Sequence, residues 1–347
     1  MADTGLLKRI AQELVASGKG ILAADESTGT IKKRFDAIGI ESTPENHRIY
    51  RRLLFETPGI EEFISGVIMF DETLRQKAQG KPFEGKTLPE ILMEKGIVPG
   101  IKVDKGTAAL ANFPGEKITE GLDGLRERLV EYKSMGAKFT KWRAVITIGD
   151  AVPGIPTDIC INSNAEALAR FAAYSQEADL VPIVEPEVLM DGAHTFEKSE
   201  EVTYKTLKKV FAKLTDHRIY FPGMLLKPNW VHPGKESGTK AGDEKVARTT
   251  LKVLKETVPA EVPGIVFLSG GDSPGESTSH LDAMNELGKV PWQFSFSFGR
   301  ALQEPVLKVW QGKTENIKPA QEAFYQRAKL NYLARTGAYR KEMENGN

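Results

Sequence analysis

The chain has 347 residues, and its 47 Lys and Arg residues are balanced by 47 Asp and Glu residues, so its formal net charge is zero. This balance argues against a nucleic-acid or membrane partner, because either would favour a basic excess. The single cysteine, Cys160, excludes an intrachain disulfide and a cysteine-based metal site. Residues 1–10 show no signal or transit-peptide pattern, and no run of about 18 apolar residues occurs. We therefore expect a cytoplasmic enzyme.

Short apolar runs alternate along the chain with longer amphipathic stretches. The runs are rich in β-branched and aromatic residues, as buried parallel strands are, and their spacing leaves room for one crossover helix each. The predicted strands span residues 20–24, 64–70, 98–103, 138–146, 180–188, 224–230, 264–269 and 292–298. Predicted helices include an extra one over residues 6–14, others at 122–132, 202–214 and 246–254, and a last one over 320–334.

Eight such β-then-α units predict an α/β fold, a (β/α)8 barrel of the TIM type. It is expected to form a single domain over residues 1–347, with an extra N-terminal helix and a short C-terminal tail. The competing architecture is a doubly wound open sheet, which usually carries a G-x-G-x-x-G turn after its first strand. Here the first strand runs instead into the sequence AADESTG, which favours the barrel.

Charged side chains occur where most of the predicted strands end. In a barrel these carboxyl ends meet at one face, and that face carries the chemistry. Lys and Glu are rarely buried unless they are paired, so their presence in apolar runs needs a reason. The residues concerned are Asp25, Lys102, Asp104, Lys141, Arg143, Glu185, Glu187, Lys227 and Arg300.

Lys227 stands out because it lies inside an apolar run. Apolar walls and neighbouring cations both favour a neutral amine, which can attack a ketone carbonyl and form an imine. The alternative is a structural lysine that neutralises a carboxylate. Lys102 and Lys141 have the same two interpretations, or a third as phosphate ligands, and Lys141 shares a strand face with Arg143. Together these cations predict an anionic substrate.

Two carboxylates, Glu185 and Glu187, share one face of the fifth predicted strand. They can divide the roles of general acid and general base, or they can pair with the lysines, and both interpretations can hold at once. The first interpretation predicts a catalytic role for at least one of them.

Two segments are candidates for binding phosphate. Ser269-Gly270-Gly271 and Arg300 follow the last two predicted strands, where barrels usually bind phosphate, although an ordinary Gly-Gly turn is the alternative. The second segment is either an anion site or a helix-capping segment with solvated charges. It contains Ser27, Thr30, Lys33 and Arg34.

The histidines show no H-x-H or H-E-x-x-H spacing, so we expect no catalytic metal and no cofactor. They are His47, His194, His217, His232 and His280. A Ser-His-Asp triad is also disfavoured, because the sequence has no G-x-S-x-G elbow.

Seven motifs, taken in order, resemble those of the class I fructose-1,6-bisphosphate aldolases. They are GILAADESTG from Gly20, GIKVDKG from Gly100, KWR from Lys141, VPIVEPE from Val181, LLKPN from Leu225, FLSGG from Phe267 and FGRAL from Phe298. The resemblance runs from about Gly18 to about Gly337. It implies a metal-independent lyase that reversibly cleaves fructose 1,6-bisphosphate to dihydroxyacetone phosphate and glyceraldehyde 3-phosphate, in glycolysis and gluconeogenesis.

Carried over residue by residue, the resemblance implies that Lys227 forms a Schiff base with the substrate and that Glu185 is the acid/base group. Supporting roles in hydroxyl positioning and charge balance fall to Asp25, Lys141 and Glu187. The C1-phosphate site matches Ser269, Gly270, Gly271 and Arg300. The C6-phosphate site matches Ser27, Thr30 and Lys102, and Arg143 is a further candidate for binding substrate.

The resemblance also implies a homotetramer that acts on sugar phosphates, with cytoskeletal binding as a second role. One rival is a transaldolase-like Schiff-base transferase, but such enzymes place the lysine on an earlier strand. Another is a scaffold protein on the same fold, which would have no need of Lys227 or Glu185.

Three positions depart from the family pattern. Familiar members extend a tail that ends in a tyrosine linked to carbanion protonation, whereas the last tyrosine here is Tyr339. We expect Tyr339 to substitute, or this step to be slower. Thr30 stands where many members have serine, which keeps a hydroxyl. Asp272 stands where glutamine is common, and its charge is expected to weaken phosphate binding.

Overall fold

The computed structural model describes residues 2–149 and 154–345. Within these residues, eight parallel strands close into a barrel in the order β1-β10-β9-β8-β7-β6-β3-β2. They are β1 (Gly20–Ala24), β2 (Ile64–Met69), β3 (Val98–Lys102), β6 (Phe139–Ile146), β7 (Val181–Val188), β8 (Leu225–Leu226), β9 (Gly264–Phe267) and β10 (Gln293–Phe298). An antiparallel pair, β4 (Thr107–Ala109) and β5 (Lys117–Thr119), forms a separate small sheet. The predicted barrel is confirmed.

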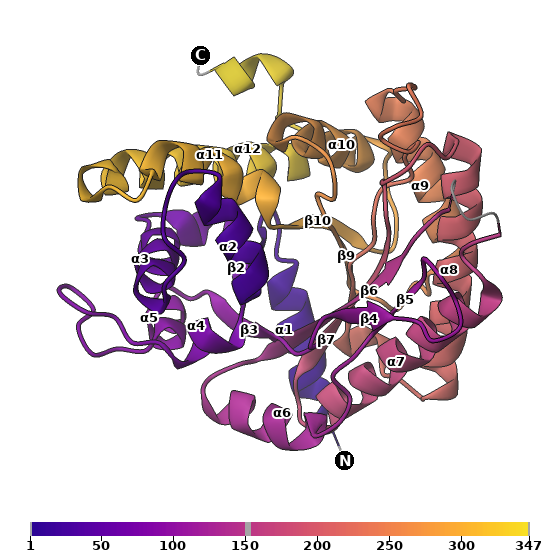
Figure 1. The fold of residues 1–347 in the computed structure, drawn as a ribbon, viewed down its shortest axis with the longest axis horizontal. Coiled ribbons are helices and arrows are strands. Elements are labelled where there is room, and N and C mark those ends of the chain that lie inside the picture. The colour runs from indigo at the N-terminus through magenta and orange to yellow at the C-terminus, as the bar shows by residue number, and fades with distance from the viewer. Residues whose placement is uncertain (1, 150–153, 346–347) are drawn as a thin grey trace.

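Helices surround the strands, with α3–α5 and α7–α9 on opposite sides of the view in Figure 1. The α-helices are α1 (Thr4–Leu14), α2 (Thr28–Asp36), α3 (Pro44–Phe55), α4 (Asp71–Arg75), α5 (Leu88–Glu94), α6 (Leu125–Ser134), α7 (Asp158–Glu177), α8 (Phe196–Asp216), α9 (Asp243–Thr257), α10 (Pro274–Glu286), α11 (Arg300–Trp310) and α12 (Ile317–Arg335). Short 3-10 segments are η1 (Ile60–Glu62), η2 (Phe221–Gly223), η3 (Thr314–Asn316) and η4 (Lys341–Asn345). Within the described chain, no helix has the length and apolarity that crossing a bilayer requires.

Local sequence signals set where several helices begin and end. At the start of α1, the Asp3 side chain accepts a hydrogen bond from the Leu6 N–H. Ser273 and Glu276 form a capping box at the start of α10. Gly136 follows α6 with a φ of 101°, a conformation that glycine adopts without strain, so the predicted stop signal is confirmed.

Strand β8 is shorter than predicted and includes only Leu225–Leu226. The chain nevertheless continues alongside its neighbours, because the Lys227 N–H donates to the Val184 carbonyl at 2.8 Å. Pro228 then interrupts the ladder, since proline has no N–H to donate. The carboxyl end of this strand is therefore held by a few backbone bonds, among them one from the Leu268 N–H to the Pro228 carbonyl at 3.1 Å.

Two large apolar cores support the barrel, beside a small cluster around Cys160. The larger one lies between the strands and the surrounding helices, and the smaller one fills the barrel interior. Helix α1 contributes Leu7 and Leu14 to the interior core and thereby seals the amino end of the barrel. Gly66 of β2 permits this approach, because a Cβ there would lie only 2.6 Å from Leu14 Cδ2. Polar groups that face inward therefore collect at the opposite, carboxyl end.

Candidate active site

Alternation along the strands brings the predicted charged residues into the barrel mouth. Ile21 and Ala23 of β1 belong to the interior core, so Asp25 continues on the same face. In β8 the interior residue Leu225 is followed two positions later by Lys227. The same spacing carries in the charged residues of β6 and β7, namely Lys141, Arg143, Glu185 and Glu187.

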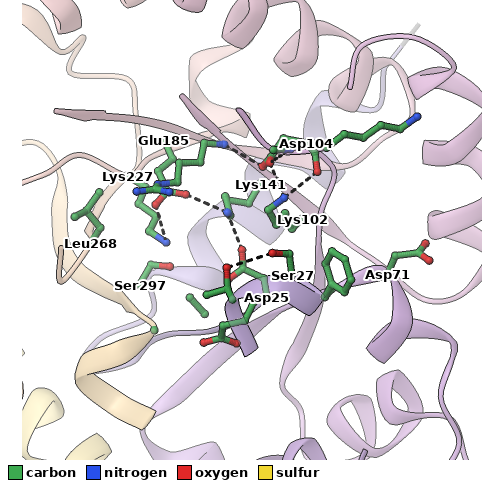
Figure 2. A pocket seen from close by; sticks show the side chains of 18 of the residues that line it. Asp25, Ser27, Asp71, Lys102, Asp104, Lys141, Glu185, Lys227, Leu268 and Ser297 are labelled. Carbon is green, nitrogen blue, oxygen red and sulfur yellow. Dashed lines mark hydrogen bonds and ion pairs between the residues drawn. The ribbon is translucent and has the colours of Figure 1, made fainter. Parts of the chain in front are cut away.

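These side chains line a cavity of about 960 Å³ at the carboxyl ends of the strands (Figure 2). The predicted residues that line it are Asp25, Ser27, Thr30, Lys102, Lys141, Arg143, Glu185, Glu187, Lys227, Ser269, Gly270 and Arg300. Gly271 and Lys33 are the predicted site residues that are not part of this lining, and all of the predicted site residues lie within the described chain. The sequence therefore located the cavity almost completely.

At the centre of the cavity, one carboxylate is shared by two ammonium groups. Lys227 Nζ lies 3.2 Å from Glu185 Oε1, and Lys141 Nζ lies 3.3 Å from Glu185 Oε2. Lys141 also contacts Asp25, with 2.7 Å between Nζ and Oδ2. Lys227, Lys141 and Glu185 are all at least 96% buried. Figure 2 shows the resulting row of alternating charges from Lys227 to Asp25.

Asp25 and Lys141 form a fixed ion pair. Burial opposes the charge of Lys141, yet the carboxylates of Asp25 and Glu185 raise its pKa above the usual range. Burial likewise opposes the charge of Asp25, but Lys141 and Lys227 hold its pKa well below the ordinary value of 3.8. Both groups are therefore charged at neutral pH, and they supply a constant electrostatic field beside Lys227.

Two further ion pairs lie at the edge of this row. Arg143 bonds to Glu187 through its Nε, and although burial opposes the charge, this carboxylate raises the pKa of Arg143. Lys102 Nζ lies 2.5 Å from Asp104 Oδ1 and also donates to the Asp104 carbonyl. Arg143 and Lys102, which were predicted to bind substrate, thus each have a carboxylate partner with which an anionic ligand would compete.

The segment after β9 meets Arg300 as predicted. An Arg300 Nη2–H donates to the Gly270 carbonyl at 2.7 Å, and Ser269 and Gly270 both line the cavity. Gly271 is covered instead by Lys235, because a Cβ at Gly271 would lie 2.0 Å from Lys235 Cε. Gly271 thus packs against the end of the Lys235 side chain and lies outside the cavity lining.

The second predicted anion segment, which contains Ser27, Thr30, Lys33 and Arg34, spans the start of α2. Ser27 occupies the N-cap position but makes no side-chain cap bond, and its Oγ lies 3.2 Å from Thr30 Oγ1. Arg34 lines the cavity together with these two hydroxyls. Lys33 is exposed and lies outside the lining, so only part of the segment faces the cavity.

Glu26 lines the cavity but was missed from the sequence, although it is adjacent to Asp25. It is buried behind β1, where its Oε2 lies 2.7 Å from Arg51 Nη2 and its Oε1 accepts from Gln303 Nε2 and pairs with Arg34. Burial would raise the pKa of Glu26, but the two guanidinium groups lower it below its usual 4.5.

Ser297 of β10 was also missed, although it lines the cavity and is 1% exposed. Its signal is the alternation of serine with phenylalanine in the sequence QFSFSF, which places small polar groups on the inner face. A serine is a weak signal on its own, because it has no charge that demands a partner.

The geometry does not support two effects that were expected from the sequence, namely that Tyr339 replaces the tail tyrosine and that the charge of Asp272 weakens phosphate binding. Tyr339 is buried outside the cavity lining and donates to Glu344 Oε1 at 2.9 Å. Burial, together with Glu344, raises the pKa of Tyr339 to about 12. The Asp272 carboxylate faces His232, with 3.4 Å between Oδ2 and Nε2, and lies outside the cavity lining.

A (β/α)8 barrel whose mouth gathers lysines and carboxylates between two cationic segments is the architecture of an enzyme that acts on an anionic substrate. The sequence matches the family described as fructose-bisphosphate aldolase class-I over residues 6–347. The chain therefore belongs to the class-I fructose-bisphosphate aldolases, and the protein is a lyase of glycolysis.

Similar proteins support this membership along nearly the whole chain. A probable fructose-bisphosphate aldolase class 1 from Xylella fastidiosa is 52% identical over 96% of this chain and 98% of its own length. Cytosolic fructose-bisphosphate aldolase 4 from Arabidopsis thaliana is 51% identical over 95% of this chain and 82% of its own. The aldolase from Plasmodium falciparum, solved in complex with TRAP and a small-molecule inhibitor, is 49% identical. Its TM-score is 0.94, over 97% of this chain and 96% of its own.

Proposed function

We propose that the enzyme cleaves fructose 1,6-bisphosphate through a Schiff base on Lys227. The observation that carries this proposal is the position of the Lys227 amine, which is 96% buried, 3.2 Å from Glu185 and beside the charged pair of Asp25 and Lys141. A buried amine with an acid/base group within reach is what imine formation requires.

In the proposed reaction the Lys227 amine attacks the C2 carbonyl, and loss of water gives a protonated imine. Glu185 takes the proton from the C4 hydroxyl as the C3–C4 bond breaks, which releases glyceraldehyde 3-phosphate. The bonding electrons pass to the imine as an enamine, which is then protonated at C3. Water hydrolyses the imine and releases dihydroxyacetone phosphate. Glu185 is close enough to exchange protons with Lys227 in both the first and the last steps.

The other charged residues have supporting roles in this proposal. Asp25 and Lys141 orient the sugar hydroxyls, and Glu187 holds Arg143 at the edge of the cavity for substrate. The C1 phosphate is assigned to Ser269, Gly270, Gly271 and Arg300. The C6 phosphate is assigned to Ser27, Thr30 and Lys102. Two anion sites on either side of one lysine suit a substrate with a phosphate at each end.

Borohydride trapping tests the proposal directly. The protein is incubated with dihydroxyacetone phosphate in the presence of EDTA, reduced with borohydride and digested for peptide mass spectrometry. The expected result is an adduct on Lys227, and Lys227→Met is expected to remove it. An adduct on another lysine, or none from folded protein, would overturn the Schiff-base assignment.

For the assembled protein we propose one domain over residues 1–347, a homotetramer and a cytosolic location. The cytosolic name of the Arabidopsis relative supports the location. The Plasmodium relative in complex with TRAP supports a second role in binding proteins, for which we propose a cytoskeletal partner. Light scattering after size-exclusion chromatography tests the tetramer, which a mass near the 38.3 kDa of one chain would contradict.

A further inference from the structure

Three buried side chains meet behind the segment that follows β9. His232 comes from the chain after β8, Asp272 from the segment between β9 and α10, and His280 from α10 itself. One nitrogen or oxygen atom from each lies within 4.8 Å of the corresponding atoms of the other two. The residues are only 7%, 6% and 4% exposed, and they lie outside the lining of the cavity that holds Lys227.

The His232 and Asp272 atoms that face one another lack hydrogen bonds. His232 Nε2 and Asp272 Oδ2 are 3.4 Å apart, and neither atom has a hydrogen-bond partner within the described residues. Buried polar atoms in proteins are nearly always bonded, so each exception calls for an explanation, and a bound ion is one such explanation. Both atoms also have lone pairs that a metal ion can accept.

The spacing suits coordination by a small divalent ion. With bonds of about 2.1 Å to nitrogen and oxygen, two ligands of a tetrahedral ion lie roughly 3.4 Å apart. His232 Nε2 and Asp272 Oδ2 already have this separation. The ligand atom of His280 lies within 4.8 Å of both of these atoms, so a small adjustment of the His280 side chain would complete the set.

His280 also has the supporting contact that metal-binding histidines usually have. Its Nδ1 lies 2.9 Å from Asp243 Oδ1 at the start of α9, at ion-pair distance but without hydrogen-bond geometry. A carboxylate beside Nδ1 favours the tautomer that carries its proton there and leaves the Nε2 lone pair free to bind a metal. Lys341 holds the other oxygen of Asp243 at 2.7 Å.

We propose that His232, Asp272 and His280 bind one divalent transition-metal ion of the Zn²⁺ type. Two imidazoles and one carboxylate suit such ions, whereas Mg²⁺ and Ca²⁺ prefer oxygen ligands alone. The spacings of 40 and 8 residues between the ligands match no short metal motif, which explains why the sequence indicated no such site. The site is separate from the metal-independent chemistry at Lys227.

A bound ion would also stiffen the segment next to the cavity. The Asp272 N–H donates to the Ser269 carbonyl at 3.0 Å, and the Asp272 carbonyl accepts from Arg300 at 3.3 Å. Fixing the Asp272 side chain therefore fixes the residues to which the proposed function assigns the C1 phosphate. We expect KM for fructose 1,6-bisphosphate to fall severalfold when Zn²⁺ is bound, and this part rests on the proposed function.

Calorimetric titration of Zn²⁺ into chelator-treated full-length protein tests the site. The expected result is one ion per chain, with affinity reduced more than tenfold in His280→Gln and in Asp272→Asn. Mg²⁺ should give no binding. The control is His217→Gln, which removes a histidine paired with Glu166 elsewhere on the surface and should leave Zn²⁺ binding unchanged.

Absence of Zn²⁺ binding, or equal binding in the His280 and Asp272 variants, would overturn the site in favour of a plain His–Asp contact. Should a variant fail to fold, Co²⁺ bound to the unaltered protein decides the question. Intense visible absorption of a tetrahedral site supports the proposal, and the weak spectrum of an octahedral ion contradicts it. Borohydride trapping at Lys227 is independent of Zn²⁺, so failure of the metal site and failure of the proposed function are separate results.

Discussion

Asp25 and Glu26 are adjacent residues at the end of β1, and each belongs to a different buried charge cluster. The two clusters differ in how fully their carboxylate oxygens are hydrogen-bonded. Both oxygens of Glu26 are bonded, because Arg51 occupies one, while Gln303 and Arg34 occupy the other. On the cavity side, Glu185 Oε2 lies 3.3 Å from Lys141 but has no hydrogen-bond partner within the described chain. The carboxylate of the first cluster is therefore saturated with hydrogen bonds, whereas that of the second has bonding capacity left over; we call these the saturated cluster and the open cluster.

This difference separates a cluster that maintains shape from one that is available for chemistry. A fully bonded buried carboxylate gains little by changing partners, so it fixes the backbone around it. An oxygen without a hydrogen-bond partner can approach a substrate hydroxyl without first breaking an existing hydrogen bond. Substitutions in the saturated cluster should therefore reduce stability, and substitutions in the open one should reduce the rate.

The largest effect is expected at Lys227, in the open cluster. Lys227→Met keeps an unbranched side chain but removes the nucleophile, so cleavage of fructose 1,6-bisphosphate should fall by more than about 10⁴-fold. A coupled assay of glyceraldehyde 3-phosphate release measures this loss. Lys33→Met, at an exposed lysine outside the cavity lining, is the matched control and should retain activity. Substantial cleavage by Lys227→Met would remove this residue from the mechanism.

Glu185→Gln should have the next largest effect, because it keeps the shape of the side chain and removes the acid/base group. We expect kcat to fall by roughly 10²–10⁴-fold, with a smaller change in KM. Steady-state kinetics separates the two parameters. If KM rises while kcat is kept, Glu185 binds substrate without transferring protons.

Glu26→Gln tests the saturated cluster. It leaves Arg34 and Arg51 without their buried counter-charge, so the free energy of unfolding should fall by about 3 kcal/mol, with a smaller effect on kcat. Urea denaturation measures the change. The control is Glu244→Gln, which loses a contact with Arg248 that is exposed on both sides and should cost less than about 1 kcal/mol. If Glu26→Gln lost activity but kept its stability, the distinction between a cluster that maintains shape and one that is available for chemistry would be wrong.

Glu26→Gln should also change how the free energy of unfolding depends on pH. The pKa of Glu26 is lower in the folded protein than its usual 4.5, so its contribution to stability is complete above that pH and disappears as the pH falls below it. The unfolding free energy of Glu26→Gln should therefore depend less on pH than that of the unaltered protein below about pH 4.5. Equal slopes in acid titrations of the two proteins would contradict this expectation.

The smallest effect is expected at Arg300, which is exposed at the cavity edge. Arg300→Ala removes one charged ligand proposed for the C1 phosphate, so KM for fructose 1,6-bisphosphate should rise about tenfold with kcat less affected. The matched control is Lys318→Ala, which removes an exposed cation on α12. An unchanged KM would place the phosphate elsewhere in the cavity.

Periodicity predicted the barrel and most of its mouth, because charges such as Lys141 and Glu185 occur in phase with apolar interior residues. What it could not predict depends on contacts between distant segments. Arg51 and Gln303 meet Glu26 only because α3 and α11 pack against the end of β1. The hairpin of β4 and β5 was missed as well, since its three-residue strands are too short and too exposed for a periodic signal.

Closure of the barrel through the pairing of β1 with β10 determines when the site can exist. Asp25 follows the first strand and Arg300 follows the last, and these strands are neighbours through pairs such as Ile21 with Ser297. During synthesis, the cavity therefore stays incomplete until about 300 residues have left the ribosome, at roughly 5–20 residues per second. A ligand that contacts both Asp25 and Arg300 can bind only the closed barrel. By mass action, such a ligand therefore protects the pairing of β1 with β10 from opening and the chain from proteolysis there.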